Sequence, residues 1–237
     1  VSVPPVAVIA PPESTPSPAT GTVADGYRVD TVTDLGPLSN LSLQNTPYSI
    51  NVLSGDFIEN TGGYMSLGND ILNKSPFYAQ DYTDQRGIAT AGSQRGLVSG
   101  SVLDFFTTDG LPAATNGSNI GAEAYDHIEI LSGGVTGFLY GVNGDVGGVN
   151  FVLKRPTPQP YYSATLGYDD GGPYGNVDVG NTLANGKFGY RFVAAGNFGN
   201  SASVANQSTG RSLVYSAFDI RPADNLLVQL DVLHSTY

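Results

Sequence analysis

The sequence predicts an α+β domain followed by antiparallel strands of a membrane β-barrel, which is incomplete in this chain. Two observations support this fold class. First, the β-forming runs Asp126–Leu131 and Gly148–Leu153 flank a glycine-rich link, whose glycines allow tight, packed turns. Second, the chain after Pro160 consists of short segments in which apolar and polar residues alternate between turn signals.

The composition is typical of a β-rich or membrane-associated protein. The 237 residues include 31 Gly, 15 Pro and 14 Tyr, which indicates many turns and amphipathic aromatic side chains. A formal charge of −11, with only 10 Lys and Arg, argues against nucleic-acid binding, which needs clustered basic residues. No run of about 18 apolar residues is present, so we expect no transmembrane helix, whereas a transmembrane β-strand needs only about 9–11 alternating residues.

Residues 1–24 are predicted to be a flexible arm. The segment is rich in Pro, Ala, Ser and Thr, and it buries too little apolar surface to offset the entropy lost on ordering. Because the chain begins at Val1 without a signal peptide, we expect a mature or trimmed product.

Residues 25–158 are predicted to form the α+β domain. Ser49–Leu53 alternates as a strand, and capping residues indicate short helices at Gly55–Asn60 and Tyr64–Leu72. Two long polar segments, Phe77–Gln94 and Phe105–Gly121, are predicted to be loops. Loops of that length in a compact domain often bind ligands.

Residues 159–237 are predicted to form the first strands of the barrel, about five in number, with apolar side chains facing lipid and polar ones facing inward. The strand around Val214–Ile220 alternates poorly, so its faces are left unassigned. Five strands cannot close into a barrel, and open sheet edges are not tolerated in hydrocarbon, so the end at Tyr237 suggests a truncated chain. The side chains expected to face outward are those of Tyr162, Ala164, Leu166 and Tyr168, of Tyr190, Phe192 and Ala194, and of Leu226, Val228, Leu230 and Val232.

Several ordered blocks of the sequence carry a family resemblance. They are Thr46-Pro47-Tyr48, Ile71-Leu72-Asn73-Lys74-Ser75-Pro76, Arg95-Gly96, Asp109-Gly110-Leu111-Pro112, Ile128-Glu129-Ile130-Leu131, Leu139-Tyr140-Gly141, Gly147-Gly148-Val149-Asn150 and Lys154-Arg155-Pro156. Together they resemble the plug domain of TonB-dependent outer-membrane receptors, in particular the siderophore-receptor branch. The resemblance implies an outer-membrane β-barrel of roughly 22 strands around the plug, of which this chain holds the plug and the first strands.

The resemblance also implies partners and a location. In the family, the N-terminal arm carries a TonB box that pairs with the TonB energy transducer. Our first candidate for this box is Val6-Ala7-Val8-Ile9-Ala10, and the second is Asp30-Thr31-Val32-Thr33. The other expected partners are a ferric siderophore and outer-membrane lipids, and the expected location is the bacterial cell outer membrane.

Functional residues follow from the same resemblance. Arg95 and Glu129 correspond to a buried charge pair that holds the plug to the barrel, and we expect it to act as a release latch. The apex loops of the plug lie beneath the bound chelate in the family. The residues expected to bind the siderophore there are Arg86, Tyr82, Tyr78, Asn116 and Asn119.

The sequence predicts no enzyme. It has no Cys and only two His, and it lacks a nucleophile elbow, a P-loop and paired metal ligands. We therefore expect no catalytic residue, no cofactor and no metal site. Import of a ferric siderophore is the preferred function. The alternatives are a non-transporting plug-bearing module that binds a ligand or signals, and import of another nutrient such as a glycan or cobalamin.

Overall fold

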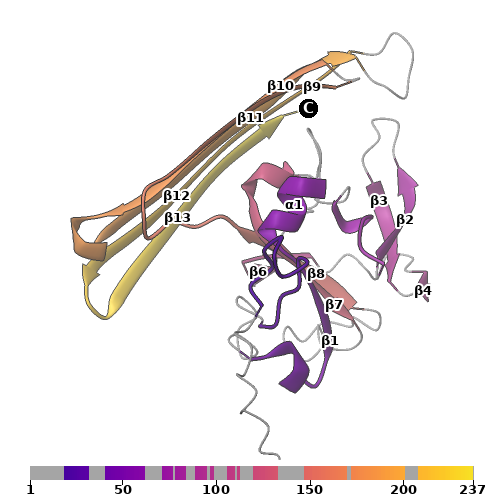
Figure 1. The fold of residues 1–237 in the computed structure, drawn as a ribbon, viewed down its shortest axis with the longest axis horizontal. Helices are drawn as coiled ribbons and strands as arrows, with labels where there is room; N and C mark the ends of the chain where they lie inside the picture. Colours follow the sequence, from indigo (N-terminus) through magenta and orange to yellow (C-terminus); the bar gives the residue numbers. More distant parts are fainter. Residues whose placement is uncertain are drawn as a thin grey trace, which may run out of the picture.

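The structure is a computed structural model that describes residues 19–31, 41–61, 71–76, 78–83, 89–94, 97–98, 106–109, 111–112, 120–132, 147–169, 172–200 and 208–236. These residues form an N-terminal domain and a five-stranded sheet that lies along one side of it (Figure 1). The face of this sheet that contacts the domain is called the inner face. Within the described residues, no helix is long and apolar enough to cross a membrane.

Two small sheets and short helical segments build the described part of the N-terminal domain. The main sheet has the strand order β1-β7-β8-β5-β6, in which β7 is antiparallel to β1 and β8, and β5 is parallel to β8. The second sheet has the order β2-β3-β4. The elements are η2 (Leu43–Asn45), β1 (Ser49–Leu53), α1 (Gly55–Thr61), β2 (Tyr78–Thr83), β3 (Ala89–Gln94), β4 (Leu97–Val98), β5 (Phe106–Thr108), β6 (Leu111–Pro112), η4 (Ala122–Ala124), β7 (Tyr125–Ser132) and β8 (Gly147–Leu153).

The central strands β7 and β8 supply the core of this domain. Every residue of β8 is buried, in agreement with its nearly continuous apolar sequence. Ile128, Ile130 and Phe151 are fully buried, and the rings of Phe151 and Tyr125 pack with centroids 5.1 Å apart. The same core continues into the inner face of the five-stranded sheet through buried residues such as Val193.

The secondary-structure predictions for this domain hold in part. The strand Ser49–Leu53 and the helix that begins at Gly55 are confirmed. Of the predicted helix Tyr64–Leu72, the structure describes Ile71 and Leu72, which are helical. The two long loops are wrong as predicted, because Phe77–Gln94 contains β2 and β3 and Phe105–Gly121 contains β5 and β6. These strands are short and mostly polar, so their backbones pair without an apolar alternation that a sequence could reveal.

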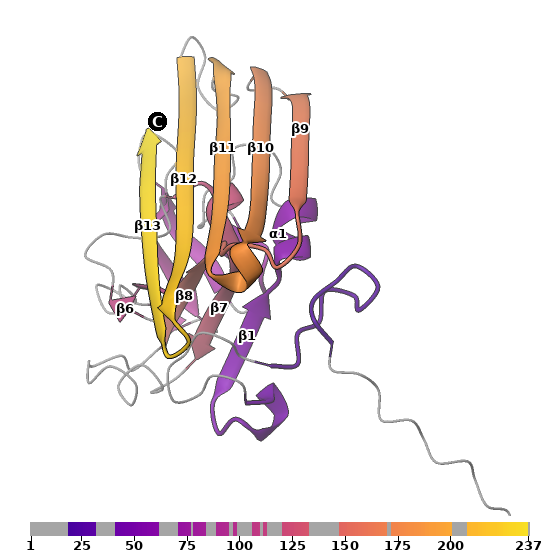
Figure 2. The same cartoon turned by 90° about the vertical axis from the view of Figure 1, so that its left-hand side faces the viewer.

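The five-stranded sheet is an antiparallel meander in the order β13-β12-β11-β10-β9 (Figure 2). Its strand number agrees with the prediction. On β9, Tyr162, Leu166 and Tyr168 are 73%, 88% and 79% exposed while Ser163, Thr165 and Gly167 are partly buried, which confirms the predicted faces. The strands are β9 (Tyr161–Asp169), β10 (Gly172–Leu183), β11 (Phe188–Asn200), β12 (Ser208–Ala223) and β13 (Leu226–Thr236), with η5 (Ala184–Gly186) between β10 and β11.

Strand β12 shows why its faces could not be assigned from the sequence. Leu213, Tyr215 and Ala217 on its inner side belong to the core shared with the N-terminal domain. Val214 and Ile220 on its outer side are exposed. Both sides are therefore apolar, and the alternation expected of a barrel strand with a polar interior is absent.

Between β8 and β9 the chain crosses the inner face. Residues 154–157, called the junction segment, lie so close to β10 and β11 that glycines are needed opposite them. A Cβ atom on Gly189 would lie 2.7 Å from Pro156 Cβ, and one on Gly180 would lie 2.9 Å from Thr157 Oγ1. The Thr182 hydroxyl donates a 2.8 Å hydrogen bond to the Thr157 carbonyl.

We predict that Gly189→Ala destabilises the protein by about 1–3 kcal/mol, because the added methyl group displaces Pro156. The free energy of unfolding would be measured by urea denaturation in detergent micelles. Gly175→Ala is the matched control, since a Cβ there would meet Leu166 Cδ2 at an ordinary 3.4 Å, and we expect a change within about 0.5 kcal/mol. Equal losses in the two variants would contradict close packing of the junction segment.

Candidate functional site

Buried charged side chains join the N-terminal domain to the inner face, and they form the candidate functional site. The first cluster is centred on Asp178 of β10, whose side chain is only 4% exposed. Lys154 Nζ lies 2.9 Å from Asp178 Oδ2, and Arg191 Nε and Nη2 lie 2.5 and 2.7 Å from the two carboxylate oxygens. Because both partners of the carboxylate are cations, two ion pairs offset the free-energy cost of removing the Asp178 charge from water.

Two further contacts tie this cluster to its surroundings. Lys154 Nζ also lies 3.3 Å from Oε1 of Glu59 in α1. The guanidinium of Arg191 lies over the ring of Tyr161, 4.5 Å from its centroid, which is cation–π geometry. The cluster therefore connects the helix of the N-terminal domain, the junction segment and three strands of the sheet.

The second cluster surrounds Arg155, the next residue of the junction segment. Its guanidinium forms ion pairs with Asp219 of β12 and with Asp231 of β13, the latter at 2.5 Å. The Tyr215 hydroxyl lies 2.8 Å from both the Lys154 carbonyl oxygen and Asp231 Oδ1. Two consecutive cations of the junction segment thus bind aspartates on three different strands.

A third contact lies at the η4 turn. Glu123 accepts two hydrogen bonds from Arg211 of β12, at 2.6 and 3.0 Å, and a third at 3.1 Å from the Tyr174 hydroxyl. Both charged side chains are buried. A Cβ atom on Gly121 would lie 2.1 Å from Arg211 Nη1, so the lack of a side chain at this residue admits the arginine.

Glu129 and His127 of β7 form a separate buried network inside the N-terminal domain. The fully buried Glu129 accepts a 2.8 Å hydrogen bond from Asn150 Nδ2 and lies 3.5 Å from His127 Nε2. His127 Nδ1 lies 2.8 Å from Asp126 Oδ2. Burial alone would lower the pKa of His127, but the hydrogen bonds to Asp126 and Glu129 outweigh it and raise the pKa to about 9. The imidazole is therefore a cation at neutral pH.

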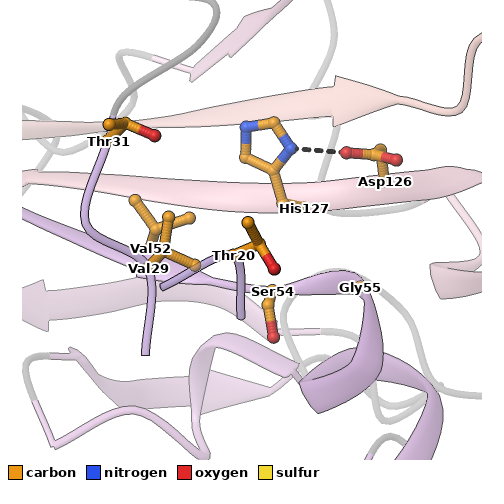
Figure 3. A pocket seen from close by; sticks show the side chains of 8 residues that line it. All are labelled: Thr20, Val29, Thr31, Val52, Ser54, Gly55, Asp126 and His127. Carbon is orange, nitrogen blue, oxygen red and sulfur yellow. Dashed lines mark hydrogen bonds and ion pairs between the residues drawn. The ribbon is translucent and has the colours of Figure 1, made fainter. Parts of the chain in front are cut away.

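His127 also lines a small pocket between the N-terminal domain and the segment Ala19–Thr31, called the arm turn (Figure 3). The pocket measures about 200 Å³. Ligand pockets usually measure about 300–1,000 Å³, so we do not assign a siderophore to it. Its lining residues are Thr20, Val29, Thr31, Val52, Ser54, Gly55, Asp126 and His127.

Most of the site residues predicted from the sequence lie outside the described residues. This holds for Arg86, Asn116 and Asn119 of the ligand site, for Arg95 of the latch and for Val6-Ala7-Val8-Ile9-Ala10 of the arm. The backbones of Tyr78 and Tyr82 belong to β2, opposite Gln94 and Ala91 of β3. Glu129 is described with His127 and Asn150 as neighbours. The ligand site, the latch and the TonB box all stay predictions.

Sequence reasoning missed the residues that join the domain to the sheet. In the sequence, Lys154 and Arg155 stand only in a block that resembles the family, and Glu123 and Asp178 belong to no recognisable motif. One signal was available, because Asp178 and Arg191 interrupt predicted strands at positions that would face inward. Lys154 and Asp178 are 24 residues apart along the chain, and Glu123 and Arg211 are 88 residues apart. Sequence spacing therefore could not have paired them.

No family model matches this chain, and no curated protein matches it. Several solved structures match this chain. The alcaligin outer membrane receptor FauA from Bordetella pertussis is 25% identical, with a TM-score of 0.68 over 88% of this chain. The ferric preacinetobactin receptor BauA from Acinetobacter baumannii is 23% identical (TM-score 0.73, 86% of this chain), and the ferripyoverdine receptor of Pseudomonas aeruginosa is 20% identical (TM-score 0.72, 83%). The chain spans 35%, 30% and 26% of their respective lengths.

The described fold is that of outer-membrane receptors in which a plug domain precedes a β-barrel. More narrowly, it is the fold of the plug and first barrel strands of TonB-dependent siderophore receptors. The resemblance and the fold class predicted from the sequence are thus confirmed. The similar structures are receptors of the outer membrane, which agrees with the predicted location in the bacterial outer membrane.

We predict that Asp178→Asn destabilises the protein by about 3–5 kcal/mol, because it leaves Lys154 and Arg191 buried without their shared counter-charge. Lys154→Met should be milder, about 1–3 kcal/mol, since Asp178 keeps Arg191. Urea denaturation measures both. Arg28→Gln, which removes the exposed Arg28–Asp30 pair, is the control and should have no measurable effect. A larger loss for Lys154→Met than for Asp178→Asn would show that Asp178 is not the centre of the cluster.

We predict that stability falls between about pH 6.5 and pH 9 because of His127, whose pKa is raised from 6.5 to about 9 in the folded protein. The stabilisation is complete below the unfolded pKa and is lost as the pH rises through the folded pKa. The loss should be on the order of 2–3 kcal/mol. The free energy of unfolding of His127→Gln should lack this decrease. His234→Gln, which changes the other histidine, should retain it, and a parent protein with equal stability at both pH values would refute the assignment.

Proposed function

We propose that this chain is the plug and first barrel strands of an outer-membrane receptor that imports a ferric siderophore, driven by TonB. The fold supports the proposal, and similar structures are receptors for alcaligin, ferric preacinetobactin and ferripyoverdine. The mechanism needs no covalent chemistry and no enzyme activity. It needs a plug with two states, one that holds the chelate and one that releases it.

The observation that carries the proposal is the set of ion pairs between the N-terminal domain and the inner face, which are buried at Asp178 and Glu123 and partly exposed at Arg155. Lys154, Arg155 and Glu123 each bind an oppositely charged side chain on the sheet. A buried ion pair adds little net stability when it is intact, because desolvation offsets the attraction, but it is specific in geometry. Water entering this interface would replace the lost polar contacts, which lowers the free-energy cost of moving the plug against the sheet.

Ligand capture is assigned to the apex of the plug. We propose that Arg86 donates hydrogen bonds to an anionic oxygen of the chelate. Tyr78, Tyr82, Asn116 and Asn119 would add stacking and hydrogen bonds from the same side.

We assign energy coupling to the arm and the latch. A strand formed by Val6–Ala10 would pair with the edge of the TonB sheet and transmit a pull. Arg95 and Glu129 would form the latch that this pull opens. Lipids of the outer membrane would cover the exposed apolar side chains on the outer face, such as Leu166.

The proposal is tested by uptake of radioactive ferric siderophores into cells that produce the protein, with binding to the same cells measured in parallel. Deletion of residues 1–18 should abolish uptake and leave binding unchanged, because the arm transmits energy and does not touch the ligand. Arg86→Ala should weaken binding about 10- to 150-fold, the expected loss for a charge-assisted hydrogen bond. Lys187→Ala, on the turn between β10 and β11, is the control for Arg86 and should bind normally.

Three outcomes would overturn parts of the proposal. Uptake that persists both after the deletion and after Val32→Pro, which blocks pairing by the second TonB-box candidate, excludes coupling through this arm. Binding without uptake in the parent protein identifies a non-transporting module. Binding of a glycan or cobalamin in place of every ferric siderophore tested moves the substrate to another class.

A further inference from the structure

The arm turn is a compact unit that is docked on helix α1. Two of its own carboxylates stabilise the turn. Asp25 accepts hydrogen bonds from the backbone and side chain of Thr22 and from the backbone of Thr20. Asp30 accepts a hydrogen bond from the backbone of Ala19. These bonds lower the pKa of Asp25, the side-chain bond from Thr22 being the largest cause. A turn organised in this way can carry a force without first unravelling.

Three contacts attach the arm turn to the start of α1. The buried Ser54 hydroxyl donates a 2.6 Å hydrogen bond to the Gly21 carbonyl, and the backbone N–H of Val23 donates a 3.0 Å hydrogen bond to Asp56. The Tyr27 ring meets the Phe57 ring edge-on at 5.7 Å. Gly21 has φ +87° and its hydrogen faces Ser54, where a Cβ would lie 2.4 Å from Ser54 Cβ. The contact therefore requires glycine in the arm.

Ser54 belongs to the helix as much as to the arm contact. Its hydroxyl oxygen accepts a 3.2 Å hydrogen bond from the backbone N–H of Phe57, and its carbonyl accepts one from Ile58. These are the bonds of an N-cap residue. When the arm turn leaves, the cap loses the partner that fixes its rotamer, so undocking weakens the first turn of α1.

The same helix also contacts the charged cluster. Glu59, one turn beyond Gly55, pairs with Lys154 at 3.3 Å, and Lys154 pairs with Asp178 of β10 at 2.9 Å. Polar contacts thus connect Gly21 in the arm to Ser54 at the start of α1, and Glu59 of the same helix through Lys154 to the inner face; the helix backbone joins the two sets. The intervening helix has only seven residues, so a change at its cap affects the turn that holds Glu59.

We infer that α1 transmits a pull on the arm to the Lys154–Asp178 ion pair, which holds the plug against β10, with Ser54 and Glu59 as positioning residues at the start and the end of this route. The inference rests on one part of the proposed function, namely that TonB pulls on the arm. Because energetic coupling between two sites is reciprocal, breaking the Glu59–Lys154 contact should loosen the distant arm turn, with neither TonB nor a ligand present.

The test uses the reactivity of a cysteine at Ala19 with a maleimide in isolated outer membranes. Ala19 is 4% exposed and the sequence contains no cysteine, so Ala19→Cys reports how often the arm turn undocks. In this background, Ser54→Ala removes the direct contact and should raise the labelling rate about 5- to 30-fold. Glu59→Gln should raise it about 2- to 5-fold, the size expected of a partly exposed ion pair.

The matched control is Glu123→Gln, which also replaces a glutamate of the N-terminal domain that pairs with a cation at the interface with the sheet, but outside α1. It should leave the labelling rate at the parent value. An increase for Glu59→Gln that exceeds the increase for Glu123→Gln supports the route through α1. Any other pattern overturns it, since an equal or larger effect of Glu123→Gln means general loosening of the plug. The assay involves no transport, so failure here and failure of siderophore uptake are separate results.

Discussion

The contact between Lys154 and Asp178 is the interaction on which the rest of this structure depends. Asp178 is too deeply buried to carry its charge without partners, and it has one in the junction segment and one, Arg191, on the neighbouring strand. Asp178 lies opposite Val193, so Arg191 reaches it diagonally across Gly180. One carboxylate thereby fixes both the placement of the domain against the sheet and the arrangement of side chains across β10 and β11.

The interface around this contact combines two kinds of surface with different behaviour. Apolar residues of the inner face, including Val193 and Tyr215, share a core with the N-terminal domain. Charged residues beside them form ion pairs with oppositely charged side chains. Burial of apolar surface stabilises the contact between plug and sheet but depends little on their relative orientation. The ion pairs require a specific geometry and therefore select one position of the plug on the sheet. The two kinds of contact together hold the N-terminal domain in one position on the sheet.

The sequence predicts this fold better than it predicts the site, for physical reasons. The faces of β9 follow from alternation, because Leu166 and its outward neighbours face away from the domain while small or polar residues face it. The faces of β12 do not, since the domain covers Leu213 and its inward neighbours with apolar surface. Ion pairs such as Glu123–Arg211 join residues 88 positions apart, and only the packed structure reveals them. The resemblance implied a latch of Arg95 and Glu129. The described ion pairs between the domain and the sheet are formed by other residues, namely Lys154, Arg155 and Glu123.

The junction segment has a consequence for biogenesis. It is continuous with β8 of the plug at one end and with β9 of the sheet at the other, and its residue Pro156 occupies the space left by Gly189. Chain segments seated in this way are not threaded into a finished enclosure. Pairing of β9, β10 and β11 beside this segment therefore requires the junction segment, and with it β8, to be in position as these strands assemble. Docking of the N-terminal domain and formation of the sheet are then steps of a single process.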